Sequence, residues 1–234
     1  MKNQKNQTQK AIIFDSGALI SFSMNGITRI LQQLKGVFQG KFLITPEVKR
    51  EVIDVPMKIK KFELEALKIK ELLDDGILEL PSALGITSQE IEKADQEFLA
   101  IANLTFSGLG KDIHILDHGE ASCLGLSKLL TERGIKNLIA IDERTTRLLV
   151  EKPENLKRIF EDRMNTRVII NSENARHFSD FKIIRSTELA YVAWKKGLTD
   201  LKDGLVVLDA LLYALKFKGA AISGEEIEEI KKLK

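Results

Sequence analysis

The chain has 234 residues, of which 44% are hydrophobic and 30% charged, and this balance excludes disorder as its main state. Its length suits one sizeable domain, or one domain with an insertion. The net charge of +2 argues against a protein that holds nucleic acid by overall charge alone, and it leaves open a local basic surface.

Cysteine usage and the absence of long apolar runs point to a compartment. The only cysteine, Cys123, excludes an intrachain disulfide and a metal site built from cysteines, and it favours a reducing environment. The first ten residues are polar and lack the apolar segment of a signal peptide. No apolar run approaches the roughly 18 residues that cross a bilayer. We therefore expect a cytoplasmic protein with no role in a membrane.

The first half of the chain alternates short apolar runs with helical patterns. After a flexible polar tail at 1–10, buried strands are expected at 11–14, 41–44 and 77–80, and helices at about 27–35, 46–54, 59–74 and 88–103. The segment FSGLGKD at 106–112 reads as a glycine-punctuated loop.

The second half continues this alternation. Helices are expected at 118–130, 143–150, 186–197 and 205–219, a charged helical piece at 155–164, and strands at 138–142, 167–170 and 182–186. Ser223 and Glu226 form a capping box for a last helix within 223–234. The alternation predicts an α/β fold with a mostly parallel sheet covered on both faces. We expect a single domain over 11–222, with an insertion at about 151–181.

Two aspartates end apolar strands. Asp15 follows AIIF and Asp142 follows LIAI. Ligands of open parallel sheets gather outside the carboxyl ends of the strands, so adjacent strands would point both aspartates into one crevice. The alternative is that each aspartate caps the helix that follows it, since Asp is a favoured N-cap.

Two glutamates have similar double interpretations. Glu51 borders the apolar positions Val48 and Val52 on a helix, where a buried carboxylate needs a partner such as a metal; alternatively it is solvated beside Arg50. Glu120 comes three residues after Asp117 and matches a capping box. The small residues that follow Glu120 would instead let the helix approach the sheet and direct this side chain inward.

In their order along the chain, IIFDSGALI, TPEVKREV, LDHGEAS and AIDERTTR resemble the PIN-domain family of nucleases. The likeness is to its archaeal and bacterial branch, which includes the toxin ribonucleases of toxin–antitoxin pairs. The resemblance spans about 11–222 and implies a three-layer α/β/α fold. Carried over position by position, it assigns catalytic and metal-binding roles to Asp15, Glu51, Glu120 and Asp142.

The resemblance also implies the chemistry and two accessory residues. Ser16 follows the first acidic position, and Thr187 stands where the family often has a hydroxyl residue, although Thr187 also reads as a plain N-cap. Clustered carboxylates repel one another, and all-oxygen ligands favour Mg²⁺ or Mn²⁺. We expect a metal-dependent endoribonuclease that hydrolyses RNA by direct attack of water. The alternative is a PIN-like RNA- or protein-binding subunit with weak or no catalysis.

Other features leave partners open. An antitoxin protein and a homodimer are both compatible with the sequence. The insertion carries basic residues that could contact RNA or a second subunit, and interleaved acids favour a solvated charged surface instead; these basic residues are Lys152, Lys157, Arg158, Arg163, Arg167 and Arg176. His118 lies near Glu120 in the sequence and could touch the substrate, although a lone histidine is more often structural.

Overall fold

A computed structural model describes residues 9–202 and 204–233, and its centre is a parallel sheet. The strand order is β2-β1-β5-β7, with every neighbouring pair parallel. The strands are β1 (Lys10–Phe14), β2 (Lys41–Leu43), β5 (Lys136–Ala140) and β7 (Ile183–Ile184). The predicted mostly parallel sheet is therefore confirmed. Of the predicted tail at 1–10, only Gln9 and Lys10 are described, and Lys10 already belongs to β1.

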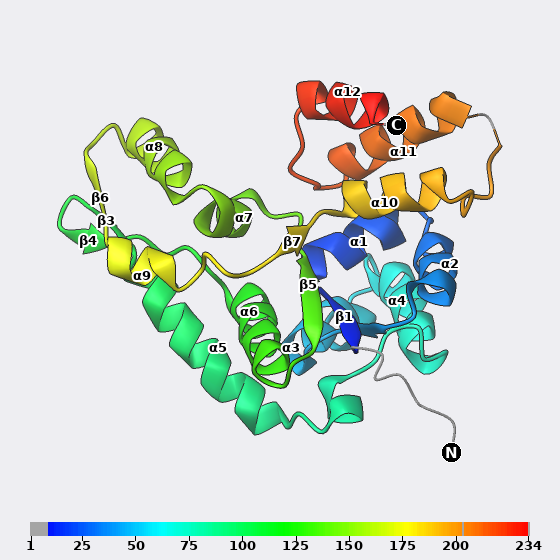
Figure 1. Cartoon of the computed structure of the whole chain (residues 1–234), viewed down its shortest axis with the longest axis horizontal. Helices are drawn as coiled ribbons and strands as arrows, with labels where there is room; N and C mark the ends of the chain where they lie inside the picture. The colour runs from blue at the N-terminus through cyan, green and yellow to red at the C-terminus, as the bar shows by residue number, and fades with distance from the viewer. Residues whose placement is uncertain (1–8, 203, 234) are drawn as a thin grey trace, which may run out of the picture.

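Helices cover both faces of this sheet and give the expected three-layer α/β/α arrangement (Figure 1). Helix α6 (His118–Glu132) packs on β1 and β5 and is backed by α5 (Ser88–Asn103). The opposite face carries α1 (Ser16–Met24), α2 (Arg29–Phe38) and α10 (Ser186–Lys195). The remaining helices of the central body are α3 (Pro46–Lys49), α4 (Glu63–Asp74), α11 (Gly204–Phe217) and α12 (Gly224–Lys232), with short turns η2 (Pro56–Lys58) and η3 (Pro81–Leu84).

A second, antiparallel sheet lies outside the central body and belongs to a projecting arm (Figure 1). The arm consists of β3 (Phe106–Gly108), β4 (Lys111–Asp112), α8 (Pro153–Met164), β6 (Val168–Ile170) and α9 (Ser172–Arg176), reached through α7 (Arg144–Glu151). Strand β3 pairs with both β4 and β6. The expected insertion at about 151–181 is thus joined to the segment 106–112, for which the sequence predicts only a loop.

Three local predictions differ from the structure. The segment FSGLGKD forms the β3–β4 hairpin, whose turn places Leu109 and Gly110 at φ +52° and +73°. The expected strand at 77–80 contributes only an isolated bridge from Glu79 to Leu43. The expected helix at 46–54 is α3 followed by η1 (Arg50–Asp54), a π-helical turn in which Val55 N–H donates to the Arg50 carbonyl at 2.9 Å.

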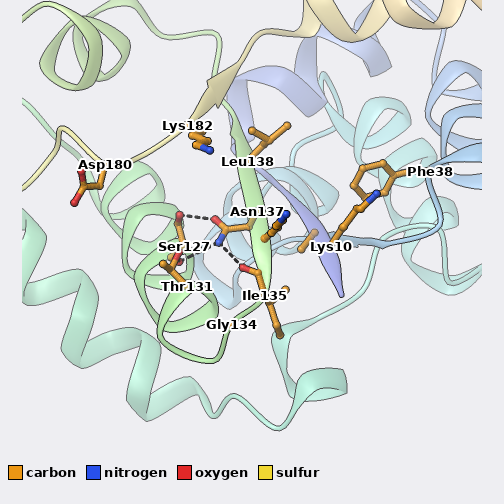
Figure 2. Close-up of a pocket in the computed structure, with 12 residues that line it drawn as sticks. Lys10, Phe38, Ser127, Thr131, Gly134, Ile135, Asn137, Leu138, Asp180 and Lys182 are labelled. Atoms are coloured by element: carbon orange, nitrogen blue, oxygen red, sulfur yellow. Dashed lines mark hydrogen bonds between the residues drawn. The ribbon is translucent and has the colours of Figure 1, made fainter. Parts of the chain in front are cut away.

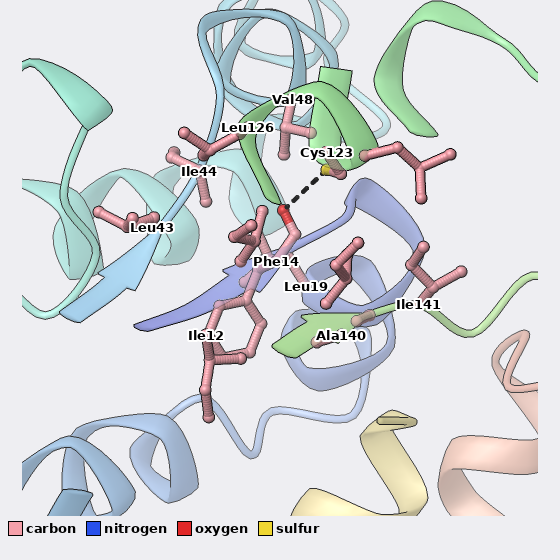
Figure 3. Close-up of a cluster of buried hydrophobic side chains, with 14 of the residues drawn as sticks. Ile12, Phe14, Leu19, Leu43, Ile44, Val48, Cys123, Leu126, Ala140 and Ile141 are labelled. Atoms are coloured by element: carbon pink, nitrogen blue, oxygen red, sulfur yellow. Dashed lines mark hydrogen bonds between the residues drawn. The ribbon is translucent and has the colours of Figure 1, made fainter. Parts of the chain in front are cut away.

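A continuous apolar core fixes the sheet against its helices (Figure 3). Ile13 and Phe14 of β1 are fully buried, and Phe14 meets Phe42 of β2 edge to face with ring centroids 5.1 Å apart. Cys123 of α6 lies above β1, and its thiol donates to the Phe14 carbonyl at 3.8 Å (Figure 3). Because this core holds β1, β5 and α6 together, the residues at their adjoining ends have fixed positions.

No helix within residues 9–202 and 204–233 combines the length and the apolar character needed to span a bilayer.

Candidate active site

Asp15 and Asp142 lie at the carboxyl ends of the two central strands. The β1–β5 ladder pairs Phe14 with Ala140 and continues with Asp15 N–H donating to the Ala140 carbonyl at 3.0 Å. Both side chains lie close to Gly17, because a Cβ built on this glycine would lie 3.4 Å from Asp15 Oδ2 and 3.9 Å from Asp142 Cβ. The structure thus brings the two aspartates together at one end of the sheet, where both are buried. Asp15 also caps α1, accepting the Gly17 N–H at 3.1 Å, so its capping interpretation is confirmed.

Glu51 approaches Asp15 from the π-helical turn η1. Its carboxylate accepts a hydrogen bond from the Ser16 hydroxyl, directly beside Asp15. The same carboxylate rests on Gly119, where a Cβ would meet Glu51 Oε2 at 2.6 Å and Oε1 at 2.9 Å. Only glycine at position 119 therefore accommodates Glu51 in this position. Glu51 is half-buried within the fold and does not point freely to solvent as the alternative required.

Glu120, in the first turn of α6, has its predicted capping role. Its Oε2 accepts the Asp117 N–H at 2.8 Å, which is the capping contact. The pKa of Glu120 is raised to about 8, mainly by burial and in part by the charges of Asp15 and Glu143, against the Asp117 N–H bond that lowers it. Glu120 therefore holds its proton more tightly than a solvated glutamate does.

Burial and mutual repulsion govern the protonation of these carboxyl groups. Burial raises the pKa of Asp15 to about 7, against hydrogen bonds from Gly17 and Ser16 that lower it, and the charges of Glu51 and Asp142 add to the rise. Burial likewise raises the pKa of Glu51, against the bond from Ser16. The cluster therefore resists full ionisation at neutral pH unless a cation balances its charge.

Asp142 provides a test of whether the site suits a cation. Its Oδ1 accepts the Ser186 N–H at 2.8 Å, whereas its Oδ2 is buried and has no hydrogen-bond partner among the described residues. The hydroxyls of Ser186 and Thr187 are also buried without such a partner. Thr187 does not cap α10, whose N-cap is Arg185, so the plain N-cap interpretation of Thr187 is wrong. Unpaired buried oxygens beside Asp15 fit an oxygen-preferring cation such as Mg²⁺ or Mn²⁺.

The carboxylates are not arranged as a finished metal cage. Within the part of the chain that the structure describes, no group of three or more His, Cys, Asp or Glu side chains is placed to hold a metal ion. Glu51 is held by Ser16, and Glu120 by the Asp117 N–H. Asp15 and Asp142 are thus the pair that the strand ends fix, whereas Glu51 and Glu120 each have one oxygen engaged in a hydrogen bond within the fold.

Two further features were missed in the sequence. Glu143 caps α7 by accepting the Thr146 N–H at 2.7 Å, and its charge contributes to the raised pKa of Glu120. In the sequence, only its position directly after Asp142 indicates a place near the site. His118 is not isolated: its Nδ1 lies 2.8 Å from Oδ2 of Asp95, a buried residue of α5. A pair 23 positions apart on two helices leaves no local trace in the sequence.

Another hollow lies away from these acidic residues. Its volume is about 540 Å³, and it opens beside the amino ends of β1 and β5, between Lys10, Ser127 and Lys182 (Figure 2). Asn137 in its wall is occupied by hydrogen bonds to Ser127, Thr131 and Ile135. It lies at the opposite ends of the strands from Asp15 and Asp142, so it is not part of the candidate site.

No family model matches the chain, and neither a curated protein nor a solved structure matches it at a significant level. Membership of the PIN-domain family accordingly stays a prediction that rests on the four motifs quoted above.

Proposed function

We propose that the chain is a metal-dependent endoribonuclease of the PIN type, with Asp15, Glu51, Glu120 and Asp142 as its acidic site and Mg²⁺ or Mn²⁺ as its cofactor. The observation that carries the proposal is the buried Asp15–Asp142 pair at the ends of adjacent parallel strands, with an unpartnered Oδ2 on Asp142. A pair of desolvated carboxylates destabilises a fold, so its burial is best explained by a ligand that it binds.

The residues of the chain have distinct parts in this activity. Asp15 and Asp142 would hold the cation, because the β1–β5 ladder and the Ser186 N–H fix their positions. A bound divalent cation would supply the polarisation of a phosphodiester and the activation of a water molecule. Ser16 positions Glu51, and Gly119 leaves the room that Glu51 needs. No side chain has to act as a nucleophile.

Thermal melting with Mn²⁺ tests the metal site, and RNA cleavage tests the activity. Mn²⁺ at 100 times its Kd should stabilise the parent chain by about 2.7 kcal/mol, and Asp15→Asn or Asp142→Asn should abolish that gain. Asp112→Asn, an exposed aspartate of the arm, is the matched control and should keep it. Labelled RNA should be cut only with Mn²⁺ or Mg²⁺. An unchanged melting temperature in Mn²⁺ contradicts the proposal.

A second candidate is an RNA- or protein-binding subunit with weak or no catalysis. The absence of a ready three-ligand group among the described residues favours it, as do the contacts that occupy Glu51 and Glu120. In that case RNA or an antitoxin-like protein would bind without cleavage, and Mn²⁺ would leave both binding and melting unchanged.

A further inference from the structure

A hollow of about 410 Å³ opens between α3, α5 and α6. Arg50 on one wall precedes Glu51 in η1, and His118 on the other precedes Gly119, against which the Glu51 carboxylate rests. Two walls of the hollow therefore adjoin Glu51, one of the proposed catalytic residues. Its apolar lining comes from Pro46 and Ile91.

His118 is exposed and yet held in one orientation. Its side chain is 64% exposed, while Asp95, which binds its Nδ1, is only 10% exposed. A free surface histidine samples several rotamers, and the hydrogen bond to a carboxylate of another helix restricts this one. The flat His118 ring is therefore held in one orientation at the rim of the hollow, whose apolar lining is Pro46 and Ile91.

Asp95 has no evident structural reason to be buried. It lies on the face of α5 that packs against α6, and its Oδ1 has no hydrogen-bond partner among the described residues. A buried carboxylate with one unsatisfied oxygen destabilises a helix interface. Its only hydrogen-bond partner within the described chain is His118. Orienting that ring is the role the contacts leave for it.

We propose that this hollow is a nucleotide subsite of the active site, in which a base of single-stranded RNA lies on the Pro46–Ile91 floor and stacks against the His118 ring that Asp95 holds. The proposal rests on the ribonuclease function proposed above. Stacking on flat side chains is the common way in which unpaired bases are bound. A hollow of this size is typical of small-ligand sites. Arg50 also lines the hollow, where its charge is balanced by Glu47, so stacking on His118 and not net charge is what would hold the base.

RNA binding is measured by fluorescence anisotropy with a labelled single-stranded RNA, in the Asp15→Asn, Asp142→Asn background so that no cleavage occurs. His118→Ala should weaken binding about tenfold, which is within the range for loss of one stacked base. His118→Phe keeps a flat ring and should restore most of the affinity. His177→Ala, an exposed histidine in the arm, should have no effect. In the parent background, kcat/KM for RNA should fall with His118→Ala by the same factor as the affinity.

The outcomes separate this subsite from the nuclease proposal. If the parent cleaves RNA with Mn²⁺ but His118→Ala binds RNA as tightly as its background, the subsite is wrong and the nuclease proposal stands. Equal weakening by His118→Ala and His118→Phe would likewise overturn stacking. If the parent neither cleaves RNA nor gains stability in Mn²⁺, the proposed function fails and the subsite fails with it. If the RNA affinity does not depend on His118, the nucleotide subsite is wrong and the hollow would instead bind a protein partner.

Discussion

Asp15→Asn should make the metal-free protein more stable, and increasingly so as the pH rises. The pKa of Asp15 is raised from 3.8 to about 7 by burial, so the folded chain holds this proton more tightly than the unfolded chain does. Between these two values the folded state binds more protons, and the free energy of unfolding therefore falls as the pH rises. A shift of about 3 units corresponds to roughly 4 kcal/mol at 1.36 kcal/mol per unit.

The asparagine variant lacks this penalty because it does not ionise, and its side-chain oxygen still accepts the Gly17 N–H. The stability gap between variant and parent should widen by about 2.5 kcal/mol from pH 5 to pH 8, the part of the titration that falls in that range. Urea unfolding followed by circular dichroism in the presence of a chelator measures the gap at each pH. Asp112→Asn removes an exposed carboxylate and serves as the control.

Saturating Mn²⁺ should reverse the order, because the parent binds the cation and the variant does not. The reasoning about Asp15 is refuted if the gap is the same at pH 5 and pH 8, or if the metal-free parent becomes the more stable protein at pH 8.

Three more outcomes are expected. Gly119→Ala should lower Mn²⁺-dependent cleavage at least tenfold and change the unfolding free energy by less than about 1 kcal/mol, because the new methyl group displaces only the flexible end of Glu51. The comparison variant is Gly125→Ala, whose Cβ would meet helix backbone at 3.2 Å. This variant should destabilise the fold by about 1–3 kcal/mol. Phe160→Ala should lower the stability of the arm by about 3–5 kcal/mol and speed its amide hydrogen exchange. The rise in melting temperature on adding Mn²⁺ should persist in this variant. Burial raises the pKa of the Cys123 thiol, so iodoacetamide should modify it only after unfolding, and rapid modification of the native chain would contradict that burial.

The sequence is informative wherever burial imposes a pattern. The apolar runs that precede Asp15 and Asp142 correctly predict β1 and β5, because strands buried on both faces are apolar throughout. The position of each aspartate at a strand end is therefore predictable from the sequence, whereas the pairing of β1 with β5 that brings them together has no local signal. The run at 77–80 is misleading because Glu79 lies in it, and this side chain binds Lys35 and Lys41 at the edge of the sheet.

Other features have no local signal. The periodicity of 46–54 is that of an ordinary helix, and the π-helical turn that directs Glu51 depends on tertiary contacts with Ser16 and Gly119. The β3–β4 hairpin resembles a loop in sequence because Leu109, which adopts a positive φ, is not one of the residues that mark such a turn. The pairing of His118 with Asp95 links two helices and depends on how they pack.

The way the arm is closed has a consequence for the order in which the chain can assemble. Gly108 of β3 pairs with Val168 of β6, 60 positions later. At a synthesis rate of roughly 5–20 residues per second, β3 emerges about 3–12 s before its partner exists. During that interval Phe106, which is fully buried in the finished protein, lacks its ring contact with Phe160. The nascent arm thus exposes an unpaired strand edge, and slower translation between 108 and 168 should increase its aggregation on the ribosome.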